Sequence, residues 1–160
     1  MTAYIHQISV SNGGVPKLAV DQAAVTAEGV SGDRQRNKKF HGGPTRAVCL
    51  YSLDMIEDLR AEGHPIVPGG TGENLTIASF DQAMWATLQP GSRLKIGSEL
   101  EIEVTSFAHP CSNIAFNFSD GDSTRISEKL HPGWGRLYAK VLTPGQVTTG
   151  DPVQLLEVPV

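Results

Sequence analysis

Two neighbouring strands are predicted from the run Leu94-Lys95-Ile96-Gly97-Ser98-Glu99-Leu100-Glu101-Ile102-Glu103-Val104-Thr105-Ser106-Phe107. Apolar residues alternate with polar ones on both sides of the Gly-Ser pair, which is the pattern of strands with one buried face. A Gly-Ser pair between such runs is typical of a tight turn. The run therefore predicts a β-hairpin with strands over 94–96 and 100–107.

Short apolar runs of strand length occur along the rest of the chain. Further strands are expected over 4–9, 17–20, 24–26, 47–51, 73–77, 137–142, 146–148 and 153–158. The chain has 17 glycines and 10 prolines, more than a helical bundle would carry, and they fall between these runs. The pattern favours a mainly β fold, either a barrel or a sandwich.

Helical patterns are few. Residues 52–60 have apolar residues at helical spacing and acids in the first turn, and Gly63 follows their end. A second helix is expected over 123–130, and a short one over 112–117. The run 47–51 is continuously apolar, so we expect a strand buried on both faces, with Cys49 as a structural residue.

Composition limits the class of protein. A chain of 160 residues, 39% of them hydrophobic, is expected to form a single domain over 1–160. The two cysteines do not suggest a disulfide framework, and no signal peptide or run of about 18 apolar residues is present, so a cytoplasmic location with no membrane insertion is expected. A net charge of −4 argues against a nucleic-acid partner.

Positive charge is nevertheless concentrated in one segment. Five of the 13 lysines and arginines lie between residues 34 and 46, together with His41: Arg34, Arg36, Lys38, Lys39 and Arg46. No apolar period survives between Gly29 and Pro44, so the segment is expected to be a long loop. Such a cluster on an acidic protein suits a small anionic ligand such as a phosphate ester, although a solvated basic loop has the same composition.

Cys111 has the surroundings of a reactive thiol. It lies just after the predicted strand 100–107 and after Pro110, and it precedes the short helix expected over 112–117. A helix that begins there would direct backbone N–H groups at the sulfur and favour the thiolate, which is the nucleophile and the metal ligand. The alternative is a small apolar residue beneath a loop.

Five motifs together resemble the MOSC domain family, named for the C-terminal domain of molybdenum cofactor sulfurases. They occur in the family's order over most of the chain: Gly32-Asp33-Arg34-Gln35, His41-Gly42-Gly43-Pro44-Thr45-Arg46-Ala47-Val48, Gly72-Glu73-Asn74-Leu75, Pro110-Cys111, and Gly145-Gln146-Val147 with Gly150-Asp151. The stand-alone bacterial members are the most similar. The resemblance implies a MOSC-type β-barrel with a few short helices.

The resemblance also implies a cofactor and a role for Cys111. The implied cofactor is the molybdenum cofactor, in which a pterin dithiolene holds molybdenum and Cys111 is a thiolate ligand of the metal or a persulfide carrier. The phosphate of this anionic pterin would be bound by Arg34, His41 and Arg46, with Lys38 and Lys39 as weaker candidates, while Gly42 and Gly43 allow close backbone approach.

The other motif residues are assigned roles as well. Asp33 either orients Arg34 or begins a turn. Glu73 and Asn74 are candidates to bind pterin edge atoms, and the alternative for Asn74, in a turn before a strand, is that it only satisfies local backbone groups. Gly150-Asp151 is expected to be a structural turn. His109 either assists thiolate formation or is an exposed histidine without a role.

Three functions follow from the resemblance. The first, which we favour, is reduction of N-hydroxylated compounds at molybdenum ligated by Cys111. With only two cysteines the chain cannot hold a four-cysteine iron–sulfur cluster, so a separate electron donor is expected. The second is sulfur carriage as a Cys111 persulfide, loaded by a separate pyridoxal-phosphate cysteine desulfurase. The third is non-catalytic storage of the cofactor.

Overall fold

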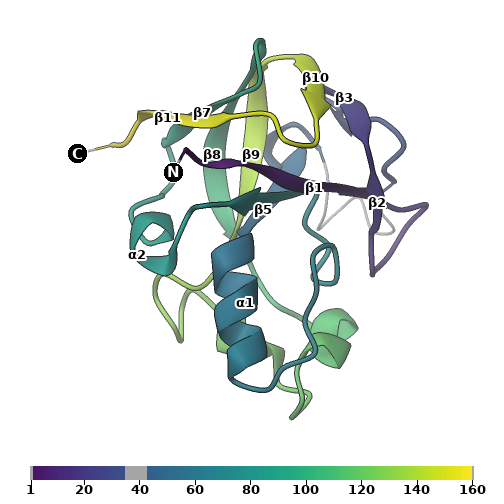
Figure 1. Cartoon of the computed structure of the whole chain (residues 1–160), viewed down its shortest axis with the longest axis vertical. Helices are drawn as coiled ribbons and strands as arrows, with labels where there is room; N and C mark the ends of the chain where they lie inside the picture. The colour runs from purple at the N-terminus through teal and green to yellow at the C-terminus, as the bar shows by residue number, and fades with distance from the viewer. Residues whose placement is uncertain (1, 35–42, 160) are drawn as a thin grey trace.

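A large, mainly antiparallel sheet dominates the structure, a computed structural model that describes residues 2–34 and 43–159 (Figure 1). Its spatial order is β11 (Val153–Glu157), β7 (Arg93–Ile96), β8 (Leu100–Ala108), β9 (Arg136–Thr143), β5 (Val48–Ser52), β6 (Leu75–Ala78), β1 (Tyr4–Val10) and β2 (Leu18–Val20). Among these described strands, β5 and β6 run parallel to each other. A smaller sheet contains β10 (Gly145–Thr148), β3 (Gln22–Thr26) and β4 (Gly29–Val30).

The predicted hairpin is confirmed. Strands β7 and β8 pair antiparallel, with Ile96 opposite Leu100 across the turn. Leu100, Ile102 and Val104 are buried, so the apolar alternation marks the face that packs on the core. Gly97 in the turn has a φ of +67°, a backbone conformation that glycine adopts without steric cost.

The mainly β class is confirmed, whereas the barrel is not. The larger sheet is an open series with β11 at one edge and β2 at the other. Backbone hydrogen bonds do join Ile5 to residues of the turn before β11, from Ile5 N to the Asp151 carbonyl at 2.9 Å and from Gly150 N to the Ile5 carbonyl at 2.7 Å. These bonds bring the two ends of the sheet together without making a continuous ladder, so closure stays a prediction.

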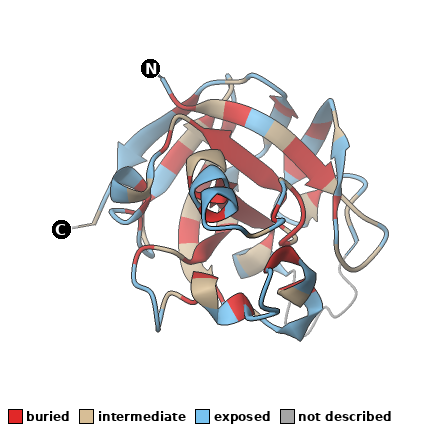
Figure 2. Cartoon of the chain, turned by 60° about the horizontal axis from the view of Figure 1, so that its bottom comes forward, coloured by how far each residue is buried: buried red, intermediate tan, exposed pale blue. Residues whose placement is uncertain are grey.

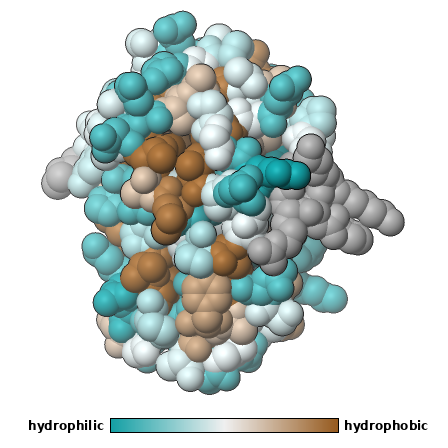
Figure 3. Space-filling view, turned by 90° about the vertical axis from the view of Figure 1, so that its right-hand side faces the viewer, coloured by the Kyte–Doolittle hydropathy of each residue, from teal (hydrophilic) through white to brown (hydrophobic). Residues whose placement is uncertain are grey.

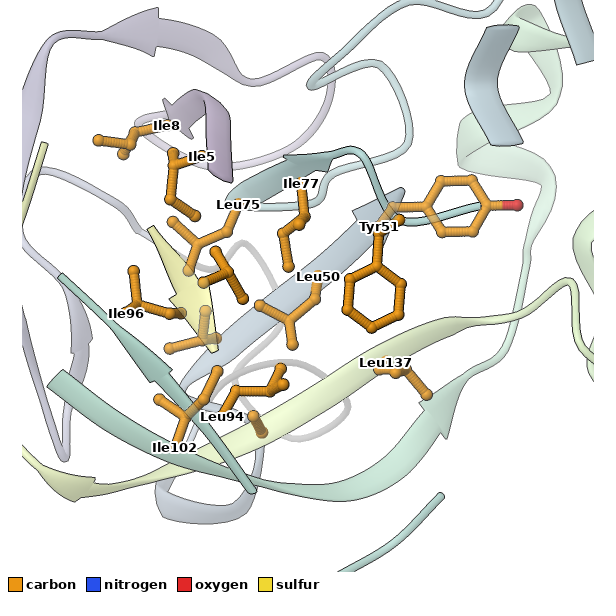
Figure 4. Packing of buried hydrophobic residues seen from close by; sticks show 14 of the residues in the cluster. Ile5, Ile8, Leu50, Tyr51, Leu75, Ile77, Leu94, Ile96, Ile102 and Leu137 are labelled. Carbon is orange, nitrogen blue, oxygen red and sulfur yellow. The ribbon is translucent and has the colours of Figure 1, made fainter. Parts of the chain in front are cut away.

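The core forms where the strands bring their apolar faces together. Ile5, Leu50, Leu75, Ile96 and Ile102, each from a different strand, belong to one cluster and point toward one another (Figure 4). Every residue of β5 is buried, as predicted from its continuous apolar run. Figure 2 shows the buried positions concentrated in the strands, while exposed positions occupy the outer loops.

The first predicted helix is confirmed and the second is wrong. Helix α1 (Leu53–Ala61) begins after Ser52 and buries Met55, Ile56 and Leu59. Instead of a helix over 123–130, the chain forms a short 3-10 helix, η3 (Ser123–Ile126). The carboxylate of Glu128 binds the backbone N–H groups of Gly133 and Gly135, at 2.8 and 3.1 Å, and these bonds hold the following segment as a loop.

The remaining helical segments are short. They are η1 (Pro44–Arg46), α2 (Gln82–Trp85) and η2 (Ser112–Asn117), the last in the position predicted for a short helix. In residues 2–34 and 43–159, no helix has the length and apolar character that a membrane span requires.

Replacing Ser52 with alanine should destabilise the protein. The Ser52 hydroxyl accepts a hydrogen bond from Met55 N at 3.2 Å and donates one to the Phe80 carbonyl at 2.5 Å, and the residue is fully buried. Loss of the helix cap and of the buried bond should lower the free energy of unfolding by about 2 kcal/mol. Urea titration of Ser52→Ala measures the loss. The exposed Ser98→Ala is the control, and equal midpoints for the two variants would contradict the prediction.

Candidate functional site

A cavity of about 460 Å³ lies where β5 and β9 meet the loops around residues 14–17, 71–72 and 109–113. The side chains that can ionise or react on its wall include Lys17, Arg46, Cys49, Cys111, Arg136 and Tyr138. Seen from the side of β2, the surface has brown apolar groups in the middle and teal polar groups around them (Figure 3). Among the described residues no carboxylate lines the wall, so the fixed charge of the wall is positive.

Cys111 lies at this cavity with an exposed thiol. It immediately precedes η2, has an extended backbone, and its side chain makes no hydrogen bond to the helix. Its carbonyl accepts hydrogen bonds from Ser123 Oγ at 3.1 Å and from Ile114 N at 3.2 Å. The backbone is therefore fixed while the thiol stays accessible, which is what a ligand or a nucleophile requires.

Cys49 was expected to be only structural, yet its side chain also lines the cavity. The residue is buried, and its backbone is bonded on both sides to Asn74: Cys49 N donates to Asn74 Oδ1 at 3.0 Å and the Cys49 carbonyl accepts from Asn74 N at 2.8 Å. Burial raises the pKa of the Cys49 thiol to about 11. Cys49 therefore contributes a neutral sulfur to the wall.

The two thiols should differ sharply in reactivity. A thiol whose pKa is about 11 is protonated below about pH 10, and the thiolate is the form that reacts. Iodoacetamide at pH 8 should therefore modify Cys111 in the native protein and leave Cys49 unmodified until the chain is unfolded in urea. Peptide mass spectrometry measures both. Modification of Cys49 in the native protein as fast as Cys111 would contradict the prediction.

Arg136 places a buried positive charge in the cavity wall. Its Nη1 donates to the Thr71 carbonyl at 2.6 Å, and Nη2 donates to the His109 carbonyl at 3.4 Å. Its Nε is buried and has no hydrogen-bond partner in the described part of the chain. Arg136 was not predicted from the sequence, although an arginine at the start of an otherwise apolar strand was a usable signal.

Arg46, a predicted ligand-binding residue, is in the cavity wall. Its guanidinium carbon lies 5.3 Å from the centre of the Tyr138 ring, which is within cation–π range. Burial, the largest cause, raises the pKa of Tyr138 to about 12, so the phenol stays protonated at physiological pH. Tyr138 and Lys17 are wall residues that the sequence analysis also missed.

Asp33 forms a buried ion pair that neither sequence interpretation anticipated. Its carboxylate lies 2.6 and 2.8 Å from Lys17 Nζ and also accepts from Asn74 Nδ2 at 2.9 Å and Ser11 N at 3.0 Å. The two charged side chains are 5% and 4% exposed, so water does not screen the pair. Asp33 thus fixes Lys17 in the cavity wall.

Glu73 and Asn74 are buried behind the wall and are absent from the lining. The Glu73 carboxylate accepts hydrogen bonds from Gly69 N, Thr71 Oγ1 and Thr76 Oγ1, at 3.0, 2.7 and 3.0 Å. Asn74 Nδ2 donates to the Ser9 carbonyl at 3.2 Å. These bonds join Glu73 and Asn74 to groups of the protein, and direct contact of either residue with a cofactor stays a prediction.

The remaining predicted residues are divided between the cavity and its surroundings. His109 is exposed and lines the cavity. Arg34 and Gly43 are exposed and do not line it. His41 and Gly42 lie outside the described residues, as do Lys38 and Lys39. The pair Gly150-Asp151 forms the predicted turn, in which Asp151 Oδ2 accepts from Thr148 N at 2.8 Å.

Comparison with known proteins gives the family. The family model of the MOSC domain matches residues 37–154. The chain belongs to the MOSC domain family. The match includes the described cavity residues Arg46, Cys49, Cys111, Arg136 and Tyr138.

Curated proteins from a bacterium and a fungus are similar to this MOSC chain. Protein YiiM of Escherichia coli (strain K12) is 30% identical over 148 residues, covering 89% of the chain and 63% of YiiM. A protein named reductase from Gibberella moniliformis is 31% identical over 139 residues, covering 84% of the chain and 24% of the relative. The chain therefore spans less than two thirds of either relative.

Solved structures share the fold. One crystal structure, of a hypothetical protein, has a TM-score of 0.75 at 24% sequence identity. The match covers 98% of this chain and 69% of the other chain. YiiM from Geobacillus stearothermophilus has a TM-score of 0.68 at 22% identity, with coverages of 97% and 75%. At these sequence identities the similarity shows a shared fold and nothing further.

Proposed function

We propose that the cavity binds the molybdenum cofactor and that the protein reduces N-hydroxylated compounds with electrons from a separate donor protein. The cofactor supplies a metal that can exchange electrons and oxygen. Membership of the MOSC family and the relative named reductase support the proposal. We place this activity in the cytoplasm, where thiols stay reduced.

The unpaired Nε of Arg136 carries the proposal. A buried guanidinium N–H without an acceptor is costly, because the group has lost water without gaining a partner. An anion bound in the cavity would supply the missing acceptor. The phosphate of the pterin is such an anion, and arginine binds phosphate through charge-assisted hydrogen bonds.

The rest of the wall also fits this cofactor. Cys111 offers an exposed soft sulfur ligand for molybdenum, while Arg46 and Lys17 add positive charge for the phosphate. The volume of about 460 Å³ is within the range of small-molecule sites. At Gly72, φ is +86° and an added Cβ would lie 3.0 Å from Val15 Cγ1, so glycine keeps this part of the wall open.

Loss of the Arg136 charge should release the cofactor. The protein is co-expressed with cofactor synthesis, and molybdenum and oxidised pterin are measured by elemental analysis and fluorescence. The wild type should hold close to one of each per chain, and Arg136→Gln should bind at least about tenfold more weakly. Arg93→Gln, which changes an exposed side chain of β7, is the control, with circular dichroism to verify folding. A metal-free wild type, or equal contents in all three proteins, would refute the proposal.

The exposure of Cys111 favours persulfide carriage as a second candidate function. The protein is incubated with a pyridoxal-phosphate cysteine desulfurase and cysteine, and bound sulfane sulfur is measured by cyanolysis. Sulfur should appear on the wild type and be absent from Cys111→Ser. A protein that holds molybdenum but shows neither turnover nor sulfane sulfur would instead be a storage protein.

A further inference from the structure

Tyr138 brings a phenol to the same cavity as the exposed thiol of Cys111. It is in β9, where its backbone is opposite Cys49 of β5 and Ser106 of β8. Its side chain packs in a small buried cluster with Cys49 and Ala108. The phenol is therefore part of the wall, at the end of the strands that lead into the Cys111 loop.

The ring of Tyr138 is held in place from two sides. Cys49 packs against it from the neighbouring strand, and the Arg46 guanidinium lies over its face at 5.3 Å. Thr105 Oγ1 contacts the carbonyls of Thr45 and Tyr138, the latter at 3.3 Å, and so links the η1 segment to β9. A group fixed in this way loses little further entropy when it binds a ligand, which favours a role in recognition or catalysis.

The phenol has the acidity that a proton donor to a leaving oxygen needs. Burial, followed by the electrostatic effect of Cys49, raises the pKa of Tyr138 to about 12, while Arg136 and Arg46 act in the opposite direction. The group is therefore protonated at neutral pH. It is still a stronger acid than water, whose pKa is about 15.7, so proton transfer to an oxygen that leaves as water is favourable.

Other donors at the cavity are less suitable. The Lys17 ammonium is bound by the Asp33 carboxylate at 2.6 Å. The Cys49 thiol is a weak hydrogen-bond donor. His109 is exposed, so bulk water reaches its ring. Tyr138 combines burial, a fixed ring and a strong O–H donor.

We propose that Tyr138 is the proton donor to the oxygen of an N-hydroxylated substrate bound beside Cys111, an inference that rests on the proposed reductase function. The N–O bond breaks as two electrons arrive from a reduced flavin or iron–sulfur protein. The leaving oxygen takes one proton from Tyr138 and becomes water, and the nitrogen takes a second proton from solvent. Solvent then returns a proton to the tyrosinate, so two electrons and two protons are consumed per molecule of water formed.

The test compares Tyr138→Phe with Tyr4→Phe, because Tyr4 is in β1 and does not line the cavity. Phenylalanine keeps the ring that packs on Cys49 and removes only the hydroxyl. An aromatic amidoxime is the substrate, and dithionite-reduced methyl viologen is the electron donor. Molybdenum content, kcat, the solvent deuterium isotope effect on kcat, and amidoxime binding to the oxidised protein without electron donor are measured.

We expect Tyr138→Phe to keep its molybdenum but to lose about 100-fold in kcat, with a changed isotope effect. Binding to the oxidised protein should weaken about threefold to tenfold, the effect of one lost hydrogen bond. Tyr4→Phe should match the wild type in all four measurements.

Three results would overturn the inference. They are a kcat for Tyr138→Phe within threefold of the wild type, a loss of activity fully explained by lost molybdenum, and a lower kcat with unchanged substrate binding and isotope effect. A wild type that holds molybdenum and does not reduce the amidoxime would refute the proposed function and this inference with it. The wild-type measurements thus test the proposed function, whereas the Tyr138→Phe measurements test the role of Tyr138 as proton donor.

Discussion

Cys111→Ser should bind molybdenum at least 100-fold more weakly than the wild type. Changes to groups that only orient a ligand already reduce metal affinity about 10- to 100-fold, so loss of the ligand itself should cost more. A serine hydroxyl is neutral at physiological pH and is a harder ligand than a thiolate. Because the Cys111 thiol is exposed and makes no helix-capping bond, the substitution should leave the fold intact. Elemental analysis measures the metal, and urea unfolding verifies stability.

Cys49→Ala is the matched control for this loss. It removes the other sulfur from the same cavity, but Cys49 is buried and its high pKa keeps the thiol protonated. Molybdenum should therefore be retained, with a moderate loss of stability from the vacated volume. If Cys49→Ala released the metal as completely as Cys111→Ser, or if Cys111→Ser kept it, the assignment of Cys111 as the ligand would be wrong.

Asp33→Ala should lower the free energy of unfolding by about 3–5 kcal/mol, because it leaves a buried charge without its partner. Lys17 and Asp33 are 5% and 4% exposed, and their closest N–O distance is 2.6 Å. Asn74 Nδ2 and Ser11 N would lose an acceptor as well. Urea titration followed by circular dichroism measures the change.

The double variant Lys17→Met/Asp33→Ala tests the reason for this loss. Removing both charges removes the unpaired ammonium, so the double variant should be more stable than Asp33→Ala alone. Arg93→Ala, which breaks an exposed pair with Glu103, should move the unfolding midpoint much less. An unfolding midpoint for Asp33→Ala equal to that of the wild type would show that the pair does not hold this part of the wall.

Local patterns were sufficient for the regular elements. The alternation in 94–107, the continuous apolar run of β5 and the amphipathic spacing of α1 each depend on neighbours in sequence, and all three predictions are confirmed. The helix expected over 123–130 is wrong because hydrogen bonds to residues beyond the predicted helix determine this part of the backbone. There the carboxylate of Glu128 satisfies backbone N–H groups five and seven residues further on.

The site was only partly predictable. The surroundings of Cys111 and the position of Arg46 were visible as motifs, and both residues are found at the cavity. Asp33, Glu73 and Asn74 are of residue types that often bind ligands, and the structure shows their side chains bonded to groups of the protein. Burial accounts for these bonds, because a carboxylate or amide removed from water must find its partners inside the protein.

The amino-acid sequence determined the mainly β class, the strands and the thiol on which the chemistry is proposed to depend, since these follow from local patterns and composition. The tertiary structure decided what surrounds that thiol. Arg136, Tyr138 and Cys49 reach one cavity because β9 pairs with β5 on one side and with β8 on the other. Lys17 joins them through its ion pair with Asp33. Strand order and register arise from contacts between residues far apart in the chain, so local sequence patterns do not predict them.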